Sequence, residues 1–156
     1  MKAIHSRVRG FTLIEILVVI GIIAILAAIV IIAINPARQF AQARNSQRVA
    51  NVNAILNAIG QNMADNKGVF MCAGAAYALP TTGTVIQSGA SGADIAPCIV
   101  PTYISALPVD PKTGTYTNAT SYNTGYTVET AGGRITVSAP QSALEDAATT
   151  TVSVTR

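Results

Sequence analysis

The feature that most constrains this chain is a long apolar run close to its start. From Ile16 to Ile34 no residue is charged or strongly polar. A helix rises 1.5 Å per residue, so this run reaches about 28 Å, close to the thickness of the hydrocarbon layer of a bilayer. The run therefore predicts a transmembrane helix, which we place at residues 11–34.

Within the first 34 residues, charged residues lie only before this run. Lys2, Arg7 and Arg9 precede it, and Glu15 stands at its head, five positions after Gly10. Basic residues before a membrane span favour a cytoplasmic location for that end of the chain. A secretory signal peptide has a shorter apolar region followed by its cleavage site, so this run is too long for one. An ordinary signal anchor accounts for the basic residues and the run, but it leaves Glu15 unexplained, and charges inside spanning segments are functional by default.

The segment Gly10-Phe11-Thr12-Leu13-Ile14-Glu15 resembles the class III signal of type IV pilins and of the pseudopilins of type II secretion. This resemblance implies that a prepilin peptidase removes residues 1–10 as a leader by cutting between Gly10 and Phe11. It also implies that the new amine of Phe11 is N-methylated and that Glu15 takes part in filament assembly. Residues 11–34 then form both the membrane anchor and the filament core.

Removal of the leader changes the charge balance of the chain. The net charge is +3, and three of the basic residues lie before the expected cut. The remaining chain has as many acidic as basic side chains, which gives no electrostatic footprint for nucleic acid. We therefore expect no nucleic-acid partner.

Residues 35–66 show the pattern of an amphipathic helix. Apolar residues recur mostly at spacings of three and four, and Asn66-Lys67-Gly68 is a typical stop. Arg38, Arg44 and Arg48 fall between the apolar positions, which predicts a solvated face with some contacts to lipid head groups; pairing with acidic groups of a neighbour in a filament is the alternative. The predicted apolar stripe consists of Phe40, Ala43, Val49, Val52, Ile55, Leu56, Ile59 and Met63.

Residues 67–156 are predicted to form a globular β domain that covers this stripe. Residues 126–130 and 134–138 alternate between apolar and polar side chains, and Ala131-Gly132-Gly133 between them predicts a hairpin. Residues 150–155 either add an edge strand or stay loose, and residues 68–101 form a long connection with at most one short strand. The expected fold is α+β and pilin-like, with a long N-terminal helix packed on a small antiparallel sheet.

Two cysteines and one aspartate are further candidate sites. Cys72 and Cys98 form an even pair in a segment expected outside the cytoplasm, which predicts a disulfide. Two cysteines without a nearby histidine do not complete a zinc site. The segment Leu107-Pro108-Val109-Asp110-Pro111 resembles one found in major pseudopilins, some of which bind calcium through acidic residues nearby. Asp110 is therefore a weak calcium candidate, and turn formation is favoured because no dense acidic loop is present.

The sequence offers no catalytic constellation. Its one histidine, His5, lies in the expected leader, so no His-based triad exists in the processed chain. The adjacent acids Glu145 and Asp146 are expected to be solvated in a flexible tail. We therefore expect no enzyme activity and no cofactor other than the calcium considered above.

These observations favour a structural subunit of a type IV pilus-like or pseudopilus filament. Its expected partners are copies of itself, the prepilin peptidase, the pilus or secretion assembly machinery and the inner membrane. We expect a single-pass inner-membrane protein with its N-terminus in the cytoplasm, and then an extracytoplasmic filament. A minor or tip subunit for adhesion or DNA uptake is one alternative, and a membrane-anchored monomer with a binding domain is another.

The first testable prediction concerns processing. The Gly10–Phe11 bond should be cut in the native host, and mass spectrometry of the mature protein should find N-methylated Phe11 as its first residue. Gly10→Val should block the cut, because the added side chain crowds a bond that the peptidase must approach closely. An intact leader, or a mature chain starting after residue 34, would contradict the prediction.

Overall fold

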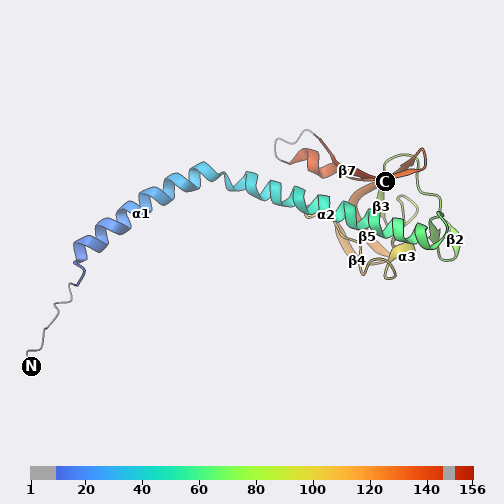
Figure 1. Ribbon diagram of the computed structural model, residues 1–156, viewed down its shortest axis with the longest axis horizontal. Helices are drawn as coiled ribbons and strands as arrows, with labels where there is room; N and C mark the ends of the chain where they lie inside the picture. The colour runs from blue at the N-terminus through green and yellow to red at the C-terminus, as the bar shows by residue number, and fades with distance from the viewer. Residues whose placement is uncertain (1–9, 146–149) are drawn as a thin grey trace, which may run out of the picture. The chain divides into compact units, whose positions relative to one another are not determined.

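The computed structural model describes residues 10–145 and 150–156 (Figure 1). The chain divides into two compact units, Met1–Gln39 and Phe40–Arg156. Of the expected leader, residues 1–10, all but Gly10 lie outside the described residues.

The first unit contains α1, which spans Leu13–Ile34 and buries none of its residues. It ends at Asn35, which adopts a left-handed conformation with φ of 46°. Asn tolerates this conformation better than most residues and is a common helix terminator. Pro36 then opens α2, Pro36–Asp65, and the amide N–H of Arg38 donates to the Asn35 side chain at 3.4 Å. Proline fits the first helical position, where its missing N–H has no partner to lose.

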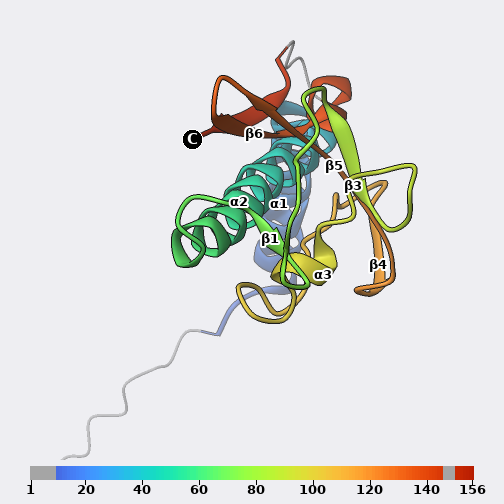
Figure 2. The same cartoon turned by 90° about the vertical axis from the view of Figure 1, so that its right-hand side faces the viewer.

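Within the second unit, α2 runs alongside the sheet (Figure 2), and its buried apolar side chains join those of the sheet in one core. Val52, Ile55, Leu56 and Ile59 are buried, as the predicted stripe required. The stripe is wrong in the first half of the helix, where Phe40, Ala43 and Val49 are exposed. The side chains that turn inward there are Ala41 and Arg48. The inward face thus becomes polar at Arg48, which an apolar periodicity cannot detect.

The main sheet has five antiparallel strands in the order β3-β5-β6-β7, and β4 also pairs with β5. The strands are β3 Thr84–Gln87, β4 Thr115–Asn118, β5 Ser121–Ala131, β6 Arg134–Ala139 and β7 Val152–Thr155. Strands β5 and β6 form the predicted hairpin, with Val128 opposite Val137. Gly132 and Gly133 turn the chain at φ of 57° and 77°, which only glycine adopts at low cost.

Alternation along β5 and β6 builds the core. Tyr126, Val128, Ile135 and Val137 are buried, which confirms the predicted inward face. Strand β7 pairs with β6, so the edge-strand interpretation of residues 150–155 is the correct one. The short 3₁₀ helix η1, Pro140–Leu144, precedes the undescribed residues 146–149.

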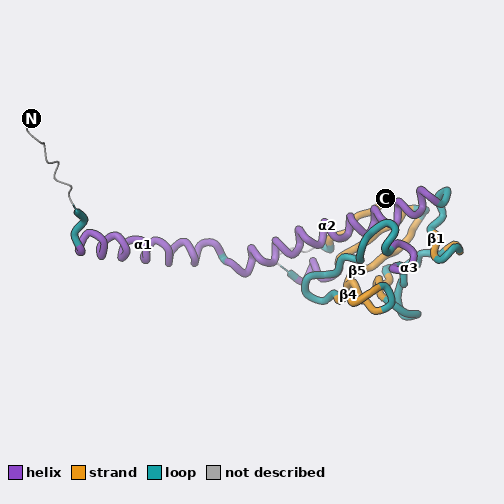
Figure 3. Tube along the Cα trace, turned by 90° about the horizontal axis from the view of Figure 1, so that it is seen from below, coloured by secondary structure: helices purple, strands orange, loops and turns teal. Residues whose placement is uncertain are grey.

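The connection between α2 and the sheet is more structured than predicted (Figure 3). The prediction of at most one short strand allows for β3, but β1 Met71–Cys72, β2 Ala75–Ala76 and α3 Ala96–Ile99 were not expected. Asn62, buried on α2, holds this region, since its side chain bonds both backbone groups of Met71 at 2.8 and 2.9 Å and the carbonyl of Cys98 at 3.0 Å. A side chain that replaces strand pairing leaves no periodic signal in the sequence.

The disulfide between Cys72 and Cys98 closes this connection, as predicted. It joins β1 to α3, with the two Cα atoms 4.3 Å apart and 26 positions apart in sequence. The bond therefore fastens two of the elements that have little regular hydrogen bonding of their own.

The second prediction concerns this bond. Thiol labelling of the native, unreduced protein should modify neither cysteine. The Cys72→Ser, Cys98→Ser double variant should lose about 3–4 kcal/mol of unfolding free energy, because the unfolded chain gains the freedom of the closed loop. The helical signal in far-UV circular dichroism should persist in the folded variant, since α2 has its own buried stripe. Labelling of both cysteines without reductant would refute the bond.

Candidate functional site

The expected cleavage site lies in exposed, non-helical chain. Gly10, Phe11 and Thr12 precede α1, and Phe11 is 83% exposed. A Cβ added to Gly10 would meet no atom within 4 Å. Nothing within the described chain therefore requires glycine at this position.

Thr12 and Glu15 form a capping box at the start of α1. The backbone N–H and the hydroxyl of Thr12 each donate to Oε2 of Glu15 at 2.8 Å, and the backbone N–H of Glu15 donates to the Thr12 hydroxyl at 3.3 Å. Such a box satisfies helix N–H groups that have no partner within the helix. A cut before Phe11 leaves the Phe11–Thr12 peptide intact, so this arrangement survives processing.

The surface of α1 is apolar on all sides. All of its residues are exposed, and it is the one helix in the described chain that is long and apolar enough to cross a membrane. Exposed apolar area of this extent is unfavourable in water by about 25 cal/mol per Å². An N-terminal helix of this kind fits a membrane-anchored pilin.

A second polar centre lies in the globular unit, around the buried Arg48. Its guanidinium donates to both carboxylate oxygens of Asp110, at 2.6 Å to Oδ2 and 3.2 Å to Oδ1. It also donates to Glu145 Oε2 at 2.8 Å and to the Asn45 side chain at 2.8 Å. Arg44 donates to the same Glu145 oxygen at 2.7 Å. We call Arg44, Arg48, Asp110, Lys112 and Glu145 the ion cluster.

The turn at Asp110 is shaped to meet Arg48. One oxygen of Asp110 accepts hydrogen bonds from the backbone N–H of Lys112 at 2.9 Å and of Thr113 at 3.1 Å, which confirms the predicted turn role. A Cβ on Gly114 would lie 2.5 Å from the Asp110 nitrogen and 2.7 Å from the Thr124 carbonyl oxygen. Only glycine therefore lets this turn press against β5.

The cluster holds both carboxylates ionised. Burial by itself would raise the pKa of Asp110, but hydrogen bonds from Arg48, Lys112 and Thr113 bring the pKa below its ordinary value. The hydrogen bond from Arg44 is the largest influence on Glu145; burial opposes it, Arg48 adds to it, and the pKa falls to about 2. The pKa of Arg48 is raised, since its two acidic partners outweigh burial.

Three sequence expectations need correction here. Arg48 is fully buried, and Arg44 is partly buried in an ion pair, so the solvated face predicted for these arginines is wrong at both positions. Their acidic partners belong to the same chain. Glu145 is not a solvated tail residue, because its side chain is 5% exposed and paired. Pairs 62 and 97 positions apart in sequence leave no local signal.

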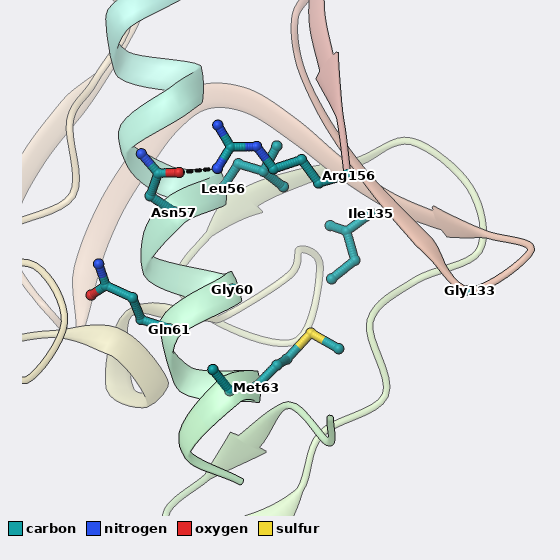
Figure 4. Close-up of a pocket in the computed structure, with 9 residues that line it drawn as sticks. Leu56, Asn57, Gly60, Gln61, Met63, Gly133, Ile135 and Arg156 are labelled. Atoms are coloured by element: carbon teal, nitrogen blue, oxygen red, sulfur yellow. Dashed lines mark hydrogen bonds between the residues drawn. The ribbon is translucent and has the colours of Figure 1, made fainter. Parts of the chain in front are cut away.

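The globular unit also has a shallow groove of about 440 Å³ (Figure 4). Leu56, Met63 and Ile135 supply apolar walls, and Arg156 donates a hydrogen bond to Asn57 at the rim. No acid, histidine or cysteine lines it. Across residues 10–145 and 150–156, no three His, Cys, Asp or Glu side chains gather as a metal-binding group, and Asp110, the calcium candidate, contacts Arg48 instead.

The third prediction tests the ion cluster. Arg48→Met should lower the unfolding free energy by about 3–5 kcal/mol, because it leaves two buried carboxylates without their shared cation. Guanidinium unfolding can be followed by near-UV circular dichroism, since all tyrosines lie in the second unit. The exposed Arg134 supplies the matched control, and Arg134→Met should change stability by no more than about 0.5 kcal/mol. Equal effects of the two substitutions would contradict the role assigned to Arg48.

Comparison with known proteins bears on the first of these sites. Residues 5–33 match the family described as the prokaryotic N-terminal methylation motif. No curated protein and no solved structure gives a significant match to the chain. The matched range contains Gly10, Phe11 and Glu15 together with almost all of α1. This chain therefore carries the class III signal of type IV pilin-like and pseudopilin-like proteins. Its exposed apolar helix and its pilin-like α+β fold agree with that signal.

Proposed function

We propose that this protein is a structural subunit of a type IV pilus-like or pseudopilus filament. The observation that carries the proposal is that the matched methylation motif includes almost all of α1, a helix that is exposed and apolar on every side. A helix that the rest of its own chain does not cover requires lipid or other copies of itself around it. Lipid surrounds the helix while it anchors the chain in the membrane, and other copies of the helix surround it after it packs into a filament.

Prepilin peptidase is the partner that the motif implies. Its cut frees an amine at Phe11, which is cationic and unfavourable in lipid, as is the carboxylate of Glu15. Both capping hydrogen bonds from Thr12 end on Oε2 of Glu15. We assign the other oxygen, Oε1, to the amine of a neighbouring subunit during assembly. Two unfavourable charges then become one paired contact, which also fixes the register between neighbours.

The capping box offers a competing explanation for Glu15. A glutamate at this position stabilises the start of a helix in any protein, whether or not the protein assembles. Glutamine also serves as the side-chain acceptor in such a box but carries no charge. Glu15→Gln therefore separates the two roles, since it retains the cap and removes the ion pair.

The fourth prediction follows from this separation. Glu15→Gln and Glu15→Leu should both insert in the membrane and be cut at Gly10, yet build few or no filaments in electron micrographs of the native host. Thr12→Ala, which removes the cap and leaves the charge, should reduce filament number less than either. Glu129→Gln on β5 is the control and should assemble normally.

Different results would support other functions. Normal filament numbers from processed Glu15→Gln would show that the charge is dispensable and would leave Glu15 with the capping role alone. Absence of any filament containing the unaltered chain would favour the membrane-anchored monomer. Filaments that persist after deletion of the gene would favour a minor or tip subunit.

A further inference from the structure

Arg44 and Lys112 are the members of the ion cluster that reach solvent, with side chains 36% and 61% exposed. The Glu145 carboxylate links Arg44 to Lys112, since it lies 2.7 Å from Arg44 Nε and 3.5 Å from Lys112 Nζ. Leu144 is its neighbour in sequence. Phe40 lies four positions before Arg44, so the two share one side of α2. We call Phe40, Arg44, Lys112 and Leu144 the basal patch.

The apolar members of the patch are exposed to an unusual degree for a folded unit. Leu144 is 75% exposed and Phe40 is 65% exposed. The main chain beside Leu144 is fixed, since Ser142 and Glu145 on either side are buried and the Ser142 hydroxyl donates to the carbonyl of Ala139 at 2.8 Å. The main chain that carries Leu144 is therefore held against the rest of the globular unit.

The patch also carries positive charge. The ion cluster contains three cations and two carboxylates, which leaves one positive charge in excess. Arg48 and both carboxylates are buried. The excess positive charge is therefore exposed to solvent at Lys112, whose side chain is 61% exposed. A surface that fits the patch must combine negative charge with an apolar layer beneath it. The interface of a bilayer that contains anionic lipid has both.

The length of the chain keeps such a surface within reach. Six positions separate Ile34, the last residue of α1, from Phe40. Even fully extended, that segment spans no more than about 20 Å. A bilayer that holds α1 therefore lies within about that distance of Phe40, whichever way the two units are oriented. No comparable covalent link holds a second copy of the chain near the patch.

We propose that Phe40, Arg44, Lys112 and Leu144 form a docking surface for the anionic lipid interface of the membrane that holds α1. The inference rests on the proposed function only for the anchoring of α1, and it does not require a filament. Docking holds the globular unit on the membrane before assembly. Extraction of α1 into a filament then separates the patch from lipid.

The chain contains no tryptophan, so single tryptophan variants act as unambiguous probes. The full-length chain with Phe40→Trp or Leu144→Trp is reconstituted at low protein-to-lipid ratio in vesicles brominated near the head groups. The lipid is phosphatidylcholine with or without phosphatidylglycerol. Val69→Trp is the matched control, because Val69 is 45% exposed, lies near Lys67 and follows the opposite end of α2. Leu26→Trp in α1 reports insertion.

Both patch probes should lose more than half of their emission to bromine in phosphatidylglycerol vesicles, and less in phosphatidylcholine alone. Val69→Trp should keep its emission in both. Adding Lys112→Gln to Leu144→Trp should reduce the quenching only where phosphatidylglycerol is present, and near-UV circular dichroism shows whether each variant is folded. Using two probes in separate variants guards against misfolding of either one.

Three results would overturn the proposal. The first is water-like emission from both patch probes in phosphatidylglycerol vesicles, and the second is equal quenching of Val69→Trp. The third is a change in emission that needs no bromine and grows with the protein-to-lipid ratio, which would assign the patch to a second copy. Failure of bromine to quench Leu26→Trp would instead remove the anchoring of α1, and the docking proposal with it.

Discussion

The constraint on which everything else depends is that α1 buries none of its residues within its own chain. An apolar helix of this length requires a covering that only lipid or other protein supplies. The methylation motif includes almost all of α1 and the Gly10–Phe11 bond before it, the capping box lies at its start, and the globular unit follows it in the chain. The globular unit accordingly stabilises itself without α1, through the stripe on α2, the β5–β6 hairpin and the disulfide.

The ion cluster holds parts of the globular unit together by buried ion pairs, in addition to apolar packing. Apolar packing covers the later half of α2, and Arg48 extends the contact toward the N-terminal half by joining Asp110 and Glu145. Buried ion pairs contribute little net stability compared with apolar replacements, but they penalise wrong arrangements heavily. This cluster therefore acts mainly to fix where the Asp110 turn and the segment before β7 meet the helix. Its position also determines which side chains remain exposed beside it, and that sets the basal patch.

Sequence reasoning was reliable where the signal is local or periodic. The apolar run, the later half of the α2 stripe and the hairpin at Gly132-Gly133 follow from composition, spacing and turn chemistry, whereas for β7 the sequence left an edge strand and a loose tail as alternatives. It failed where a single polar side chain, and not a periodic pattern of residues, holds segments of the chain together. Asn62 organises the connection through three hydrogen bonds, and Arg48 is buried by partners far away in sequence. For the candidate site, the motif located Gly10, Phe11 and Glu15, whereas the partnership of Thr12 with Glu15 was not predicted. Their spacing matches the general capping-box pattern, so the sequence carried a signal that could have found it.

The central claim is that α1 is covered first by lipid and then by other copies of itself. A photo-crosslinking residue placed at the exposed Ala24 position tests it most directly in the native host. In cells that lack the prepilin peptidase, the account predicts adducts with lipid. In cells that process the chain, it predicts crosslinks between copies of the chain in the sheared filament fraction. Lipid adducts alone from the fully processed chain, or one adduct with an unrelated protein in both strains, would contradict it.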